Sequence, residues 1–343
     1  MDEKAAEKAE FEFWQQYQCD RSRTLDGKGL STVYEARHIA TGELWAIKTV
    51  EIHKNFDYNG FWANTWERAK NLQHIYLLPI KQIHEWKDGD WKRYALLLPL
   101  VEAGSAEGEN PAENWNESQR YEFWEATAQA IQFLHNQNLV HQQLAPSHIL
   151  CKKAAGFIFP LLIQYGCAEV LPLAFIKNHE TLAPEQFDNQ EFADKRTDVW
   201  ALGILAYWLW LGKYPFGQKS TLLNNNKLKN NILRDEIPEL LNQLPPLMQK
   251  IVSRCLQKDK NERWASVSEL LEFYKKEQER ISENANVVAE NQAIAAITSS
   301  EIVAIENRPP RNFRRRPSRP INWFWVLILI GAAAVFGYWL NKF

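Results

Sequence analysis

The sequence predicts an α+β fold, followed by one C-terminal transmembrane helix. The chain has 343 residues, of which 45% are hydrophobic and 13% aromatic, so it is long enough to bury a sizeable core. Residues 122–135 have the Ala, Ile and Leu spacing of a buried helix, and residues 197–211 are almost entirely apolar. Residues 322–340 carry no charged side chain, which is typical of a membrane span. The strands and the division into lobes follow from motifs in the middle of the chain.

The first 16 residues predict a helical extension. Residues 4–17 are rich in charge, and the apolar side chains Phe11, Phe13 and Trp14 gather at one end. We expect this helix to cap the part of the protein that follows it.

Short motifs occur in a fixed order along the chain. They are W-A-I-K at 45–48, H-Q-Q-L-A-P-S-H-I-L at 141–150, A-P-E at 183–185, D-V-W-A-L-G at 198–203, G-K-Y-P-F at 212–216 and K-D-K-N-E-R at 258–263. The series resembles the eukaryotic-type protein kinases, which include bacterial Ser/Thr kinases, from about Tyr17 to Lys275. The resemblance implies a bilobal fold, with a small β-rich N-terminal lobe and a large helical C-terminal lobe.

The polar catalytic positions of these motifs are changed. The family's loop reads H-R-D-L-K-P-x-N-I-L, and here Gln143, Ala145 and His148 replace the catalytic aspartate, the lysine and the asparagine. Gln164, in L-L-I-Q-Y-G, replaces the aspartate of D-F-G that binds magnesium. A neutral amide is a poor proton acceptor near neutral pH, and magnesium prefers anionic oxygen ligands. The resemblance therefore implies a pseudokinase, in which no catalytic position is intact.

Four residues at structural positions of the family are retained. The resemblance implies that His141 packs and hydrogen-bonds within the loop, and that Asp198 accepts backbone N–H groups of the same loop. It also implies an ion pair between Glu185 of A-P-E and Arg263. These residues stabilise the fold and do not take part in a reaction.

The nucleotide-binding positions match the family less closely. Lys48 stands where the family has its phosphate-contacting lysine. For Lys48, contact with ATP and a purely structural ion pair are equal alternatives. Gly27 and Gly29 are candidates for the glycine-rich loop, although both lie one residue out of register. The glutamate partner of the lysine aligns with Thr65, and Glu67 fits only with a small gap. These positions do not establish a cofactor. The alternative is that the protein binds ATP without magnesium.

No metal site is expected. No second histidine or cysteine stands at ligand spacing beside His148 on its loop, apart from the structural His141. The four cysteines are scattered, as in a protein whose thiols are reduced.

A membrane anchor is predicted at residues 322–340. Nineteen residues span about 28 Å in a helix, close to the thickness of a bilayer's hydrocarbon core. Trp323, Trp325, Tyr338 and Trp339 lie at its two ends, where an aromatic belt is expected.

Arginines before this span predict its orientation. Six arginines precede the span: Arg308, Arg311, Arg314, Arg315, Arg316 and Arg319. After the span the only basic residue is Lys342. The positive-inside rule then places the kinase-like domain in the cytoplasm, with a single pass through the inner (cytoplasmic) membrane. The cluster also suits anionic lipid headgroups, and we expect no nucleic-acid partner.

Four parts are therefore expected. They are the helical extension at 1–16, the kinase-like domain at 17–275, a flexible linker with an Arg/Pro-rich stretch at 276–320, and the transmembrane helix at 321–341.

The function predicted from these parts is that of a membrane-tethered pseudokinase. It would act as a scaffold or allosteric signalling module for a cytoplasmic protein partner that the sequence does not identify. The alternatives are a serine/threonine protein kinase with full or residual activity, and a metal-independent ATP sensor.

Overall fold

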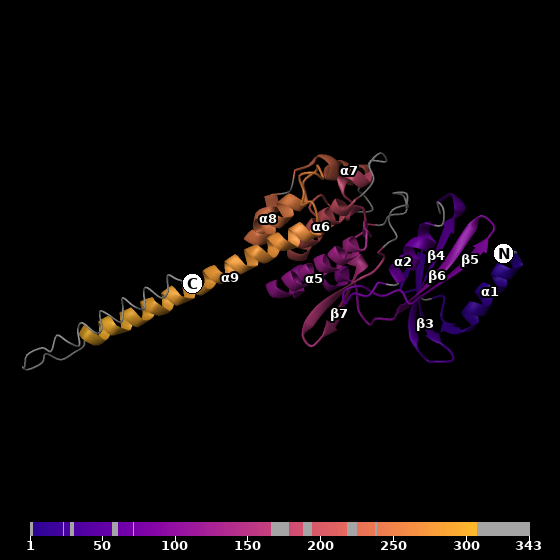
Figure 1. Cartoon of the computed structure of the whole chain (residues 1–343), viewed down its shortest axis with the longest axis horizontal. Helices are drawn as coiled ribbons and strands as arrows, with labels where there is room; N and C mark the ends of the chain where they lie inside the picture. Colours follow the sequence, from indigo (N-terminus) through magenta and orange to yellow (C-terminus); the bar gives the residue numbers. More distant parts are fainter. Residues whose placement is uncertain are drawn as a thin grey trace, which may run out of the picture. The chain divides into compact units, whose positions relative to one another are not determined.

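The computed structural model describes residues 3–22, 24–27, 31–56, 61–70, 72–165, 178–187, 194–217, 225–236 and 239–306. The chain divides into two compact units, Met1–Ile281 and Ser282–Phe343. The first unit has the two lobes that the sequence predicts, a β-sheet lobe followed by a helical lobe (Figure 1).

The N-terminal lobe is built on an antiparallel sheet. Its strands are β1 (Tyr17–Cys19), β2 (Asp26–Gly27), β3 (Ser31–His38), β4 (Leu44–His53), β5 (Gln82–Asp88) and β6 (Trp91–Pro99). Their order is β1-β3-β4-β6-β5, and β2 pairs with β3. Two tight turns place glycine in the left-handed region, at Gly42 between β3 and β4 and at Gly89 between β5 and β6.

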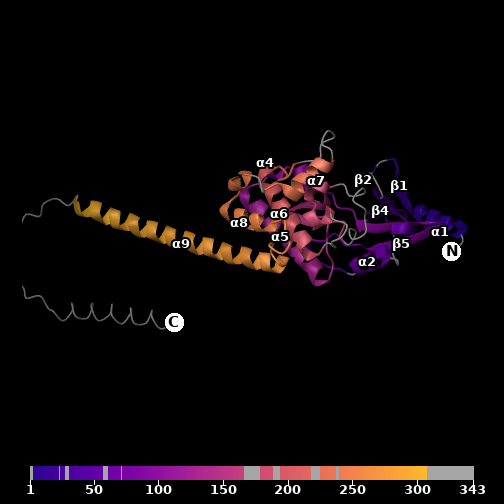
Figure 2. The same ribbon diagram turned by 90° about the horizontal axis from the view of Figure 1, so that it is seen from above.

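The two faces of this sheet pack against different partners. Side chains alternate along a strand, so Ala95 and Leu97 of β6 belong to a core cluster with helix α1 (Glu3–Gln15). Tyr94 and Leu96 belong to the main core, together with helix α2 (Phe61–Lys70). Both views show α1 beside β5 (Figures 1 and 2).

Helix α1 caps the sheet, as the sequence predicts. The ring of Phe13 lies with its centroid 5.2 Å from that of Trp86, and Phe13 is 4% exposed. Arg93 of β6 pairs with Glu10 of α1 at 2.6 Å. Phe11 on the same helix is 63% exposed, so only one stripe of α1 is buried.

The C-terminal lobe is mainly helical. Its helices are α3 (Ala106–Glu109), α4 (Pro111–Asn114), α5 (Glu117–Asn136), α6 (Lys195–Leu211), α7 (Asn225–Arg234), α8 (Pro246–Cys255) and the first part of α9 (Val267–Glu306). A hairpin of β7 (Ile149–Ala154) and β8 (Phe157–Leu162) lies beside α5. Short 3₁₀ turns are η1 (Lys54–Phe56), η3 (Pro146–His148), η5 (His179–Thr181), η6 (Pro184–Phe187) and η7 (Glu239–Gln243).

Helix α6 is the centre of this lobe. The side chain of Asp194 accepts a hydrogen bond from the backbone N–H of Arg196 at its start, and Gly212 ends it with φ 65°. Trp124 of α5 donates from Nε1 to the carbonyl of Leu202 at 3.0 Å, which ties α5 to α6. The apolar run at 197–211 is therefore a core helix, as predicted.

Most of the segment expected to be a linker is helical where the structure describes it. Helix α9 is 40 residues long and continues to Glu306, so residues 276–306 are helical. This stretch contains neither glycine nor proline and is rich in Ala, Glu and Ile, residues that extend a helix readily or at small cost. Its first turns pack on the lobe through Val267, Leu270 and Tyr274.

The expected membrane anchor at 321–341 lies outside the described residues, as does the arginine cluster before it. Of the helices in the described part of the chain, none combines the length and the apolar character needed to cross a bilayer.

Candidate functional site

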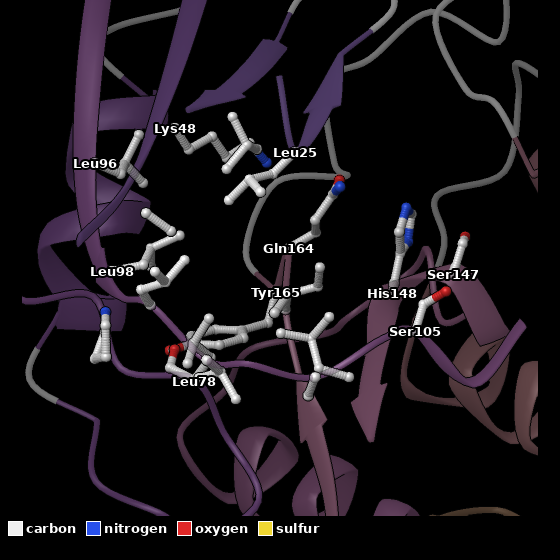
Figure 3. A pocket seen from close by; sticks show the side chains of 18 of the residues that line it. Leu25, Lys48, Leu78, Leu96, Leu98, Ser105, Ser147, His148, Gln164 and Tyr165 are labelled. Carbon is white, nitrogen blue, oxygen red and sulfur yellow. The ribbon is translucent and has the colours of Figure 1, made fainter. Parts of the chain in front are cut away.

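A cavity of about 580 Å³ is formed between the sheet and the helical lobe (Figure 3). Strand residues and their flanks form one side, and η3 and the segment after β8 form the other. The described apolar lining comprises Leu25, Val33, Ala46, Trp66, Leu78, Ile80, Leu96, Leu98, Pro99, Leu100, Val101, Ala103, Leu150, Ile163 and Tyr165. This volume lies within the usual range of small-molecule sites, roughly 300–1,000 Å³.

Lys48 lies in this cavity. It is on β4, opposite Val33 of β3 and Leu96 of β6, and it is 8% exposed. Among the described residues no carboxylate forms an ion pair with it. Of the two alternatives for Lys48, the structural ion pair is therefore not found in this part of the chain.

The structure does not bring Glu67 to the site. Glu67 of α2 has a side chain that is 56% exposed and lies 3.6 Å from Lys70 Nζ. The α2 residue in the cavity lining is Trp66, which is 1% exposed and packs edge-on against Tyr94. The sequence reasoning missed Trp66. Counting motif spacing led to its two neighbours, and only the rotation of α2 decides which side chain faces the cavity.

Asp198 organises the loop at 141–150. Its carboxylate accepts backbone N–H groups of His141 at 2.8 Å and Gln142 at 2.7 Å, and lies 2.8 Å from His135 Nε2. Burial raises the pKa of Asp198, but hydrogen bonds and charges from His135 and His141 outweigh burial, so the net pKa lies below its ordinary value. His141 Nε2 lies 3.1 Å from the carbonyl oxygen of Ile163. Asp198 therefore accepts the backbone N–H groups that the resemblance implies, and His141 makes a hydrogen-bond contact within the loop region.

Three changed positions of the loop are buried. Gln143 Nε2 is buried and has no hydrogen-bond partner among the described residues. Ala145 is 2% exposed. His148 Nδ1 lies 2.6 Å from the carbonyl oxygen of Gln143, and its Nε2 lies 3.2 Å from Asn178 Nδ2. These contacts fix the orientation of the imidazole, and Asn178 is a partner that motif spacing did not reveal.

Gln164 adopts a left-handed backbone conformation, with φ 65°. It lines the cavity beside Tyr165, whose hydroxyl donates to the carbonyl of Leu78 at 2.7 Å. The position that resembles the metal-binding aspartate therefore presents a neutral amide.

The ion pair expected between Glu185 and Arg263 is present. Arg263 Nη1 and Nη2 each lie 2.8 Å from an oxygen of Glu185, and both side chains are buried. Thr197 donates its hydroxyl to Glu185 at 2.9 Å. Burial raises the pKa of Glu185, but hydrogen bonding and charge from Arg263 outweigh burial, so the net pKa lies below its ordinary value.

The glycine candidates are only partly described. Gly27 lies in β2 opposite Thr32 of β3, and Gly29 lies outside the described residues. No group of three or more His, Cys, Asp or Glu side chains within the described ranges is placed to hold a metal ion.

The fold and this cleft define the class of protein. The family model of the protein kinase domain matches residues 25–274, so the chain belongs to the protein kinase family. The domain of rad53, solved as residues 1–466 in complex with AMP-PNP, has a TM-score of 0.61 at 20% identity, covering 76% of this chain and 65% of that one. This likeness shows the shared fold.

Similar curated proteins are serine/threonine kinases and related kinases. Aurora kinase of Eremothecium gossypii is 26% identical over 216 residues, which cover 60% of this chain and 57% of that protein. The serine/threonine-protein kinase PknJ of Mycobacterium tuberculosis is 23% identical over 264 residues, which cover 72% of this chain and 43% of that protein. The chain thus spans less than two thirds of the length of either relative.

Proposed function

We propose that this protein is a pseudokinase, a kinase-fold domain that acts by binding rather than by phosphoryl transfer. One observation carries the proposal. The scaffold of the catalytic loop is intact around Asp198, whereas the positions of proton acceptor and metal ligands hold Gln143, His148 and Gln164. A loop that keeps its shape without its reacting groups suits a role in recognition.

The chemistry of these three side chains supports the proposal. A carboxylate at the loop aspartate position positions the attacking hydroxyl, and anionic oxygens hold the magnesium ions that neutralise phosphate charge. The amides of Gln143 and Gln164 supply neither a basic group nor a negative charge. His148 offers a nitrogen donor, whereas magnesium prefers oxygen ligands, and its ring is already held by Gln143 and Asn178.

A membrane tether is part of the proposal. The uncharged run at 322–340, its aromatic ends and the arginines at 308–319 support a single-pass anchor with the kinase-fold domain in the cytoplasm. We propose a scaffold or allosteric signalling role there, with a cytoplasmic protein as the partner.

A phosphoryl-transfer assay tests the absence of catalysis. The full chain is incubated with labelled ATP, magnesium and myelin basic protein, beside Lys48→Met and a variant with Gln143→Asp, Ala145→Lys, His148→Asn and Gln164→Asp. We expect wild-type transfer equal to that of Lys48→Met, and an increase of at least about a hundredfold in the four-fold variant. Wild-type transfer that Lys48→Met abolishes would show an active serine/threonine kinase instead.

Binding of ATP without metal is a second candidate, favoured by Lys48, a cationic side chain in the lining of the cavity. A thermal-shift titration with ATP, with and without magnesium, tests it. Ligand at a hundred times its Kd stabilises the folded state by about 2.7 kcal/mol, which a melting curve resolves. A metal-independent shift that Lys48→Ala removes would establish the nucleotide sensor, and no shift at millimolar ATP would reject it.

A further inference from the structure

The cleft has an apolar lining with few charges. Among its described lining residues, Lys48 and Glu107 are the only lysine, arginine or acidic side chains, and His148 is the only histidine. The strands and their ends contribute aliphatic side chains, and Trp66 extends this apolar surface on the α2 side. A ligand that fills the cleft therefore has a mainly apolar body.

The ammonium group of Lys48 has no counter-charge from the described protein. The residue Lys48 as a whole is 8% exposed and its side chain reaches into the cavity, while Glu67 of α2 lies against Lys70 at 3.6 Å. Inside a cleft with a mainly apolar lining, an ion pair with this cation is less screened than it would be in bulk water. An anionic group on a ligand would supply the missing counter-charge.

Gln164 supplies a second donor. Its backbone is fixed in the left-handed region, and in Figure 3 its amide points into the cavity, as does the side chain of Lys48 from β4. An amide N–H donates to an anion but adds no charge. Together the two side chains offer one positive charge and additional hydrogen bonds.

This charge count disfavours a triphosphate. A triphosphate carries several negative charges, which kinases balance with magnesium held by carboxylates and carbonyl-type oxygens. Here Gln143, His148 and Gln164 provide no carboxylate, and Glu107 adds a negative charge to the lining. A single carboxylate needs only one ion pair, and Lys48 can supply it locally although Glu107 makes the lining as a whole neutral.

We propose that the cleft binds an apolar molecule with a single carboxylate, without magnesium, and that Lys48 and Gln164 hold the carboxylate. The proposal rests on the non-catalytic role proposed above. It names the class of ligand that would occupy the cleft, and no bond is made or broken.

A matched pair of probes tests this ligand class. The full chain in lipid nanodiscs is titrated calorimetrically with 1-naphthaleneacetate and with 1-naphthaleneacetamide, which has the same aromatic body without the charge. Titration of protein-free nanodiscs removes the contribution of lipid partition. We expect the carboxylate to bind at least about tenfold more tightly than the amide, because a hydrogen bond to a charged group contributes about 1.5–3 kcal/mol.

Two variants assign this preference to Lys48. Lys48→Met keeps a long unbranched side chain, one atom shorter, and removes the charge, and we expect this variant to bind both probes equally. Lys152→Met makes the same charge change at an exposed residue of β7, and the preference should survive. A third variant, Ala103→Trp, fills the cavity from a half-buried position and should abolish binding of the carboxylate even if Lys48→Met does not fold.

Several outcomes would overturn the proposal. These are equal binding of the two probes by the wild type, binding of neither, binding that survives Ala103→Trp, and tighter binding of ATP than of the carboxylate. Each of them leaves the pseudokinase proposal standing, because phosphoryl transfer is measured separately.

Discussion

At the scale of single residues, buried polar contacts stabilise the helical lobe: Arg263 pairs with Glu185, and Asp198 accepts two backbone N–H groups. Glu185, Asp198 and Arg263 could be predicted because the family's motifs fix them in order and spacing. Trp66 and Asn178 could not, because the contact of each depends on elements that are distant in the chain.

Loss of Arg263 should destabilise the helical lobe strongly. Arg263→Met leaves the buried carboxylate of Glu185 without its cation, which costs about 3–5 kcal/mol. Denaturant unfolding of the full chain, followed by near-ultraviolet circular dichroism, measures this. Lys250→Met removes a pair in which the lysine is 58% exposed, and Glu277 keeps its second partner Arg280, so this change should have little effect. Equal effects of the two substitutions would contradict the role assigned to Glu185 and Arg263.

Lys258 should make the stability depend on pH above neutrality. Its Nζ donates to the carbonyl of Ile232 at 2.7 Å and lies 3.7 Å from the centre of the Phe216 ring. Burial lowers its pKa from 10.5 to about 8. Between these two values the unfolded chain binds more protons than the folded protein, so the contribution of this residue to stability rises with pH.

The measurement compares wild type with Lys258→Met. The difference in denaturant midpoint between the two proteins should change from about pH 8 to about pH 10.5, in favour of wild type as the pH rises. Using the difference removes the effect of other groups, such as Tyr121, whose pKa burial raises to about 12. A difference that is constant across this window would show that Lys258 titrates normally.

At the scale of elements, the apolar face of helix α1 packs the helix against the sheet. Phe13 packs against Trp86 and Tyr17, while Phe11 two residues earlier is exposed. The sequence predicted a helix with apolar residues at one end, and it left open which of them the sheet would bury. Packing settled this, because only one side of the helix meets β5.

The two phenylalanines provide a matched test of this cap. Phe13→Ala should destabilise the protein by about 3–5 kcal/mol, because it opens a cavity in a closed cluster. Phe11→Ala should change the stability little, because its ring is 63% exposed. Thermal and denaturant unfolding of both variants measures the contrast. Similar losses in both would mean that α1 does not pack by the stripe described.

At the scale of the whole molecule, a kinase-fold unit precedes a C-terminal part that contains the predicted anchor. Residues 276–306 of the expected linker continue helix α9, which begins in the lobe. The segment has no glycine or proline to interrupt the helix, and its Ala and Glu residues favour helix formation. Its polar composition without a clear period had suggested a coil.

Truncation tests the proposed anchor. A chain that ends at residue 320 should move from the membrane fraction to the supernatant after cell lysis, because it lacks the uncharged run at 322–340. Replacing the six arginines at 308–319 with glutamine, with the uncharged run retained, should leave the protein in the membrane fraction. The domain should then be placed on the cytoplasmic side in a smaller share of the molecules. A truncated chain that stays in the membrane fraction would contradict the anchor.

The sequence by itself determined the kinase family, the two lobes, the Glu185–Arg263 pair and the role of Asp198. Motif order and spacing carry this information, because each motif serves a fixed local structure. The tertiary structure decided that Lys48 has no carboxylate partner among the described residues, that Trp66 takes the place at the cleft, and that His148 is held by Gln143 and Asn178. These features depend on helix rotation and on contacts between distant segments, which a linear pattern does not specify.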